Sequence, residues 1–121
     1  MNTLENKELK VLSFKTPNAF EKWLAKNHNK VNGILLRFYK KNSEKKSITY
    51  REAVDESLCY GWIDGQANKF DDESWIQKFT PRRAGSIWSK RNIANVERLM
   101  KLEKMKPAGL DEVAKAKADG R

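Results

Sequence analysis

Cysteine and histidine are almost absent from this chain, which has one of each in 121 residues. The single thiol, Cys59, excludes an internal disulfide and fits a reducing compartment. With His28 as the only histidine, a dedicated zinc or iron–sulfur site would have too few ligands. We therefore expect no metal and no cofactor.

Long apolar runs are also missing. The longest aliphatic run is Ile34-Leu35-Leu36, whereas a membrane-spanning helix needs about 20 apolar residues. The first fourteen residues mix Glu, Lys and Asn with isolated leucines, and they lack the apolar region of a signal peptide. We expect a cytoplasmic protein without a membrane span, with residues 1–13 as a ragged N-terminal segment.

Charge is abundant and unevenly spread. The formal net charge is +9, and residues 37–51 and 82–106 are strongly basic. Between them, residues 52–75 carry seven acidic side chains against Lys69. A basic excess attracts anions and polyanions through its summed field. The same charges also suit a solvated surface, so both interpretations stay open.

Local patterns predict the first half of the fold. Thr16-Pro17 is typical of a helix start, and apolar residues at helical spacing carry this helix to residues 27–29. Residues 33–40 alternate as a strand does, with Ile34, Leu36 and Phe38 on one side. Thr49 and Glu52 have capping-box spacing, and Gly61 should end that second helix.

A hairpin and two more helices are predicted for the second half. Residues 62–68 and 74–80 form its arms, with Gly65 as a bulge; the rival assignment is a tight turn at Asp64-Gly65. A helix capped by Ser86 or Ser89 should run to about Lys104. Pro107 and Gly109 should break it, and a last short helix should follow. The side chains expected to face inward are Ile93, Val96, Leu99 and Met100 in the longer helix, and Leu110, Val113 and Ala114 in the shorter one.

These elements indicate a single α+β domain with a small, mainly antiparallel sheet and three or four helices. The 121 residues suffice for one core, and four Trp, five Phe and three Tyr supply large side chains to bury.

A candidate site lies between the strand at Trp62–Asp64 and the segment 82–92. Guanidinium groups after a strand and serines before a helix are suited to holding an anion. In this hypothesis the arginines neutralise the anion, Ser89 and Asn92 orient it, and two indoles wall the pocket. The candidate ligand-binding residues are Trp62, Asp64, Arg82, Arg83, Ser86, Trp88, Ser89 and Asn92.

Structural interpretations compete at each position. An arginine can pair with Asp64 or the acidic turn and lock the hairpin to the helix. Asp64 can be a general base or an ordinary turn residue before glycine. The serines can be helix caps, the tryptophans core residues, and Cys59 an inert buried thiol.

Seven short segments, spread in order over nearly the whole chain, form a recognisable pattern: residues 14–17, 23–24, 50–54, 59–65, 79–83, 86–92 and 119–121. This combination resembles the YdeI/OmpD-associated, or bacteriocin-protection, family of bacterial proteins. The resemblance implies a small bacterial α+β domain with a proposed link to outer-membrane porin and to bacteriocin or peptide resistance. It implies little chemistry.

Three functions follow as hypotheses. The favoured one is a non-enzymatic binding or stress-protection module that holds a small anionic ligand; a protein partner stays unknown. A basic nucleic-acid-binding module is an alternative, not favoured because residues 52–75 would repel a polyanion unless they face away. A small enzyme that uses Asp64 with Arg82 and Arg83 is the other alternative; no catalytic residue is assigned.

Overall fold

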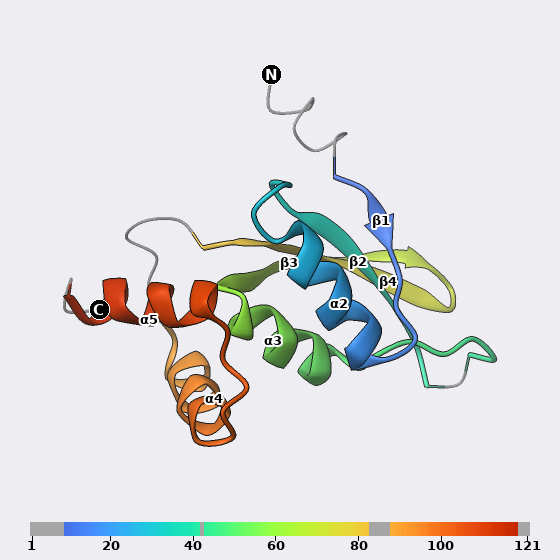
Figure 1. The fold of residues 1–121 in the computed structure, drawn as a ribbon. Coiled ribbons are helices and arrows are strands. Elements are labelled where there is room, and N and C mark those ends of the chain that lie inside the picture. The colour runs from blue at the N-terminus through green and yellow to red at the C-terminus, as the bar shows by residue number, and fades with distance from the viewer. Residues whose placement is uncertain (1–8, 42, 83–87, 119–121) are drawn as a thin grey trace.

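The structure, a computed structural model, describes residues 9–41, 43–82 and 88–118. The elements are β1 (Val11–Leu12), α2 (Pro17–Asn27), β2 (Ile34–Tyr39), α3 (Tyr50–Cys59), β3 (Trp62–Asp71), β4 (Ser74–Pro81), α4 (Lys90–Lys101) and α5 (Pro107–Ala118). Within the described ranges, strands and helices alternate as far as β3, a hairpin and two helices follow, and the helices gather beside one sheet (Figure 1). The α+β prediction is confirmed.

The sheet has the strand order β1-β2-β4-β3. The short strand β1 pairs parallel with β2, and the other neighbours are antiparallel. The hairpin of β3 and β4 has the long arms expected from the sequence. Its register shifts between Asp64 and Ala67, which confirms a bulge at Gly65 rather than a tight turn.

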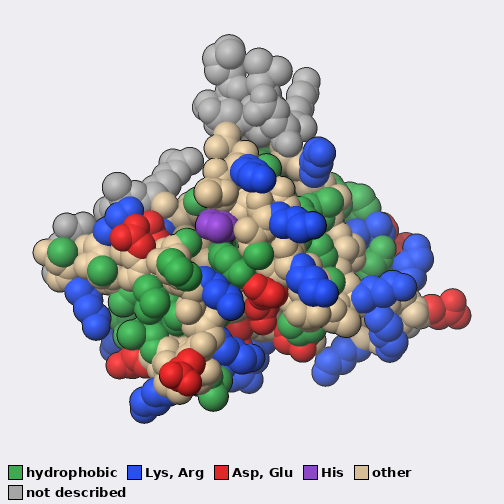
Figure 2. Space-filling view, in the orientation of Figure 1, with side chains coloured by type: hydrophobic (Ala, Val, Ile, Leu, Met, Phe, Trp, Pro, Cys, Tyr) green, Lys and Arg blue, Asp and Glu red, His purple; other side chains and the backbone are tan. Residues whose placement is uncertain are grey.

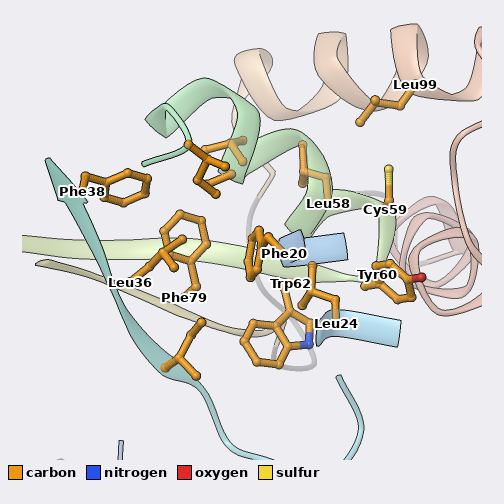
Figure 3. Close-up of a cluster of buried hydrophobic side chains, with 14 of the residues drawn as sticks. Phe20, Leu24, Leu36, Phe38, Leu58, Cys59, Tyr60, Trp62, Phe79 and Leu99 are labelled. Atoms are coloured by element: carbon orange, nitrogen blue, oxygen red, sulfur yellow. The ribbon is translucent and has the colours of Figure 1, made fainter. Parts of the chain in front are cut away.

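The core fills one face of the sheet. Side chains alternate along β2, so Ile34, Leu36 and Phe38 are buried together on that face. Phe79 of β4 lies among them, and the helices pack against this layer (Figure 3). The helical contribution includes Phe20, Leu24, Val54, Leu58, Val96 and Leu99 in the core, with Val113 packed against it.

The opposite face of the sheet carries a mixed surface, which we call the open face. Leu35, Arg37 and Tyr39 alternate with the buried residues of β2, and all three are partly exposed. The antiparallel register places Lys78 beside Leu35 and Ile76 beside Arg37. Because the described helices join the core on the other side, none of them covers these side chains.

Helix ends follow the predicted local chemistry. Thr16 caps α2 and Thr49 forms a complete capping box with Glu52. Ser89 caps α4 by accepting from the Asn92 backbone N–H at 3.0 Å. Gly61, with φ +77°, ends α3 in a conformation that favours glycine.

The inward stripe of α4 differs from the prediction, and the helix ends at Lys101 rather than near Lys104. Ile93 is 43% exposed and Met100 41% exposed. The buried stripe is Asn92, Val96 and Leu99, at spacings of four and three residues. Because Asn92 occupies the first buried position of the helix, Ile93 and Met100, which flank this stripe, face outward.

Those outward residues join an apolar surface between α4 and α5, visible as clustered hydrophobic side chains in Figure 2. A shallow hollow of about 150 Å³ lies there, lined by Trp88, Ile93, Val96, Met100 and Val113 with three other side chains. Leu110 and Ala114 of α5 were predicted to face inward, but both are exposed.

Gly109 also differs from expectation, because it lies within α5 instead of breaking a helix. A Cβ atom at this position would come within 2.4 Å of the Cys59 carbonyl oxygen and 2.7 Å of the Leu58 carbonyl oxygen. The glycine therefore lets α5 approach the end of α3. Pro107 begins α5, as proline suits the first turn of a helix.

Gly109→Ala should destabilise the protein by about 3 kcal/mol, because backbone atoms cannot move aside cheaply. Helix propensity alone predicts the opposite sign, a gain of about 1 kcal/mol. Urea denaturation measures the difference. The matched control is Gly65→Ala, whose Cβ would meet only ordinary contacts at 3.4 Å or more; its cost should stay below about 1 kcal/mol. Equal effects at both glycines would contradict the close-approach interpretation.

Candidate functional site

Trp62 is a core residue. Its side chain is 1% exposed, and its indole N–H donates to the His28 carbonyl oxygen at 3.1 Å. The ring of Trp23 meets it edge-on, with centroids 5.9 Å apart. Trp62 thus joins the end of α2 to the start of β3 and does not wall an open pocket.

Asp64 faces α3 rather than a turn tip. Its Oδ2 accepts from the Tyr50 hydroxyl at 2.5 Å, and the Gln77 side-chain amide lies 3.5 Å from the same oxygen. Burial, followed by the hydrogen bond to Asp64, raises the pKa of Tyr50 to about 12. The carboxylate therefore stabilises the contact between the sheet and the first turn of α3.

Arg82 and Trp88 come together across the segment that joins β4 to α4. The guanidinium carbon lies 3.8 Å from the centroid of the indole ring, a close cation–π contact. Arg82 is only 7% exposed, and its backbone N–H donates to the Gly61 carbonyl oxygen at 3.0 Å. The arginine is thus held against the start of β3 while Trp88 covers it.

Ser89 and Asn92 are also neighbours, but as a helix cap. The Ser89 hydroxyl accepts the Asn92 backbone N–H, and the Asn92 side chain is buried under the first turn of α4. The remaining two predicted site residues, Arg83 and Ser86, lie outside the described residues. Of the predicted set, then, the structure pairs Arg82 with Trp88 and Ser89 with Asn92, and it places Trp62 and Asp64 in separate packing roles.

Arg82 is also one of the residues that line a groove of about 770 Å³. This groove is bounded by β1, the C-terminal half of α2, the connection before β2 and the end of β4. We call it the basic groove. Its lining residues are Leu9, Lys10, Leu12, Trp23, Asn27, Lys30, Val31, Asn32, Gly33, Ile34, Lys78, Thr80, Pro81 and Arg82.

The charged side chains among the described lining residues of the basic groove are all cationic. Lys10, Lys30, Lys78 and Arg82 contribute four cations, and no Asp or Glu is among the described residues that line the groove. Asn27, Asn32 and Thr80 add polar groups between them. The summed field of cations that share a groove attracts anions.

Gly33 shapes the groove where β2 begins. Its φ is +147°, and a Cβ atom would lie 2.7 Å from Thr80 Cγ2 and 2.9 Å from the Phe79 carbonyl oxygen. The connection between α2 and β2 can therefore lie directly on the end of β4. Sequence reasoning identified only Arg82 of the basic groove, because its other three cations are isolated along the chain and become neighbours only through the sheet.

Other ionisable groups lie on the helix side. The Tyr60 hydroxyl donates to Glu21 at 2.5 Å. Burial, followed by this hydrogen bond, raises the pKa of Tyr60. Burial raises the pKa of the Cys59 thiol to about 12, so that thiol stays protonated and weakly nucleophilic at neutral pH. This supports the interpretation of Cys59 as a packing residue.

Two further findings concern the described part of the chain. No helix there is long and apolar enough to cross a membrane. No group of three or more His, Cys, Asp or Glu side chains in those ranges could hold a metal ion.

Comparison with known proteins places the chain in a family without an assigned activity. Residues 12–112 match the family described as a domain of unknown function, DUF8412. The chain belongs to this family. Among curated proteins nothing matches the chain, and among solved structures nothing does. The DUF8412 match carries no statement about the YdeI/OmpD-associated family, so that resemblance stays a prediction.

Tyr50→Phe should lower the free energy of unfolding by about 1–2 kcal/mol at pH 7.5, because Asp64 loses a hydrogen bond. In the wild type, the raised pKa of Tyr50 means that the neutral phenol is favoured in the folded state. Its stabilising effect is therefore complete below pH 10 and is lost as the pH rises through 12. The variant should lose less stability between pH 7.5 and pH 11 when both proteins are denatured with urea. Identical losses in the two proteins would refute this assignment.

Proposed function

We propose that this DUF8412 member is a non-enzymatic binding module that holds a small, multiply charged anion in the basic groove. The single observation that carries the proposal is the convergence of Lys10, Lys30, Lys78 and Arg82 on one groove whose described lining contains no carboxylate. Three lysines around one concave surface, with no carboxylate among its described lining residues, favour an anionic ligand.

The size of the groove supports a ligand larger than a single halide. Binding sites for small molecules have volumes of about 300–1,000 Å³ and combine apolar walls with a few placed polar groups. The basic groove, at about 770 Å³, has both kinds of wall, since Leu12, Trp23 and Ile34 line it together with its cations. Phosphate and carboxylate groups are the anions that lysine and arginine bind most strongly in proteins.

Arg82 connects this proposal with the site expected from the sequence. The same side chain lines the basic groove and contacts Trp88. The indole fixes one face of the guanidinium, which lowers the entropy that the arginine would lose on binding an anion. Asp64 lines neither the basic groove nor the hollow between α4 and α5. Its contact with Tyr50 supports a structural role over catalysis.

The resemblance to the YdeI/OmpD-associated family supplies a biological setting for the proposal. Under it, the groove serves stress or bacteriocin protection in a bacterial cytoplasm. This part of the proposal rests on the sequence motifs, whereas the anion rests on the basic groove.

Lys30→Glu should weaken binding of pyrophosphate about tenfold or more, because it places a like charge in the groove; tenfold corresponds to about 1.4 kcal/mol. Titration at 50 mM NaCl, followed by ¹H–¹⁵N spectra, measures the affinity and the residues that respond. Amide signals of residues 30–33 and 78–82 should shift in the wild type.

The control is Lys101→Glu, which makes the same change in net charge at an exposed position of α4. It should change the affinity less than about threefold, since distant exposed charges are screened by salt. Equal weakening by both variants, or no response of the wild type to millimolar pyrophosphate, would refute an anion site in this groove.

A further inference from the structure

We infer that the anion of the basic groove is the phosphodiester backbone of a single-stranded nucleic acid that continues from the groove across the open face of the sheet. This inference rests on the proposed function and names its ligand. The juxtaposition behind it is a cationic groove that shares Lys78 with a sheet face carrying the exposed ring of Phe70 and the partly exposed ring of Tyr39.

The groove and the open face share residues. Lys78 and Thr80 of β4 line the basic groove, and Lys78 also lies beside Leu35 on the open face. Two residues further along each strand, Ile76 lies beside Arg37. Alternate residues of a strand lie about 6.8 Å apart on one face, so Lys78 brings positive charge from the groove onto the open face. The charge of Arg37 is offset by Asp71, 2.6 Å away.

Aromatic rings lie at the far end of this path. Arg37 sits between two of them, with its guanidinium carbon 4.7 Å from the Tyr39 ring centroid and 4.5 Å from that of Phe70. Phe70 is 46% exposed, and Lys45 lies 5.7 Å from the Tyr39 ring. Single-stranded nucleic acids bind to such surfaces, because bases stack on rings while nearby cations neutralise phosphates.

The acidic residues of segment 52–75 do not oppose this path. Glu52, Asp55 and Glu56 belong to α3, on the helix side of the sheet. Asp64 also faces that side, where it accepts from Tyr50. In the view of Figure 2, which has α2 and α3 in front of the sheet, red acidic side chains lie among the blue basic ones.

The remaining acids of that segment lie at the β3–β4 turn, and two of them have cationic partners. Asp71 pairs with Arg37 at 2.6 Å, and Asp72 pairs with Lys69 at 3.5 Å. The third, Glu73, accepts a hydrogen bond from the Ser43 hydroxyl at 3.0 Å. Partners therefore offset the charges of Asp71 and Asp72, and the acids of α3 lie on the other side of the sheet.

A single strand fits this surface better than a duplex. Tyr39 and Phe70 can stack only on bases that are unpaired, and the open face is a sheet surface that presents no helix to enter a major groove. Three lysines in the groove also match several consecutive phosphates better than one isolated anion.

Fluorescence anisotropy with labelled dT10 and rU10 tests the inference. Both oligonucleotides should bind at 50 mM NaCl, with a slope of log affinity against log salt of about −2 if the three groove lysines each contact a phosphate. A dT10–dA10 duplex should bind at least tenfold more weakly than dT10. Duplex binding as tight as single-strand binding would overturn the inference.

Single substitutions distinguish the contribution of the aromatic rings to binding from that of the basic groove. Phe70→Ala and Tyr39→Ala should each weaken dT10 binding at least about fivefold and leave pyrophosphate binding unchanged. Lys30→Glu should weaken both ligands. The matched controls on the helix side are Leu102→Ala, which truncates another exposed apolar residue, and Lys101→Glu; both should leave dT10 binding within about threefold.

The outcomes distinguish this inference from the proposed function. Pyrophosphate binding without oligonucleotide binding overturns the inference and leaves the anion site in place. Absence of binding for every anion overturns both. Equal losses from Lys30→Glu and Lys101→Glu in dT10 binding show general charge attraction and overturn the inference. Urea denaturation of Tyr39→Ala confirms that it folds, and the exposed Phe70→Ala carries the test if it does not.

Discussion

Phe79 occupies the centre of the sheet, and the rest of the architecture depends on where its ring points. It meets Phe20 of α2 edge-on at 6.3 Å and Phe38 of β2 at 6.2 Å, and it has no exposed surface. Aromatic contacts of this kind bury large apolar areas and fix the packing direction. Since the neighbouring inward residues follow the same alternation, the described helices all lie on one face of the sheet and none of them covers the other.

Because the described helices lie on one face of the sheet, the acidic residues of α3 and the basic residues of β2 and β4 lie on opposite sides of it. The acidic residues of α3 follow the helices to one side, and Lys78 and Arg37 follow the strand alternation to the other. A sequence that looks like alternating basic and acidic blocks becomes a molecule with a cationic groove next to an uncovered sheet surface. The proposed ligand chemistry is thus a consequence of the strand period rather than of any short motif.

Local signals were enough to predict most of the elements. The caps at Thr16, Thr49 and Ser89, the hairpin arms and the bulge at Gly65 each depend on residues within a few positions of one another. Tertiary contacts decided the rest. Asn92 is polar, yet it lies in the buried stripe of α4, and Gly109 is tolerated within a helix because the end of α3 passes against it.

The candidate site was harder to predict for the same reason. Lys10, Lys30 and Lys78 have no shared spacing in the sequence, and only the β1–β2–β4 order and the turn at Gly33 bring them to Arg82. Trp62 looked like a pocket wall because it neighbours Asp64, but strand geometry alone cannot tell a wall from the core beneath it.

The outer edge of β3 has a further consequence. Its register shifts twice, between Asp64 and Ala67 and again between Lys69 and Asp71. Each bulge interrupts the row of backbone donors and acceptors that an edge strand would otherwise offer to an incoming strand, and the Lys69 ammonium lies in the exposed stretch between them. The irregular hairpin therefore also protects the molecule against edge-to-edge polymerisation.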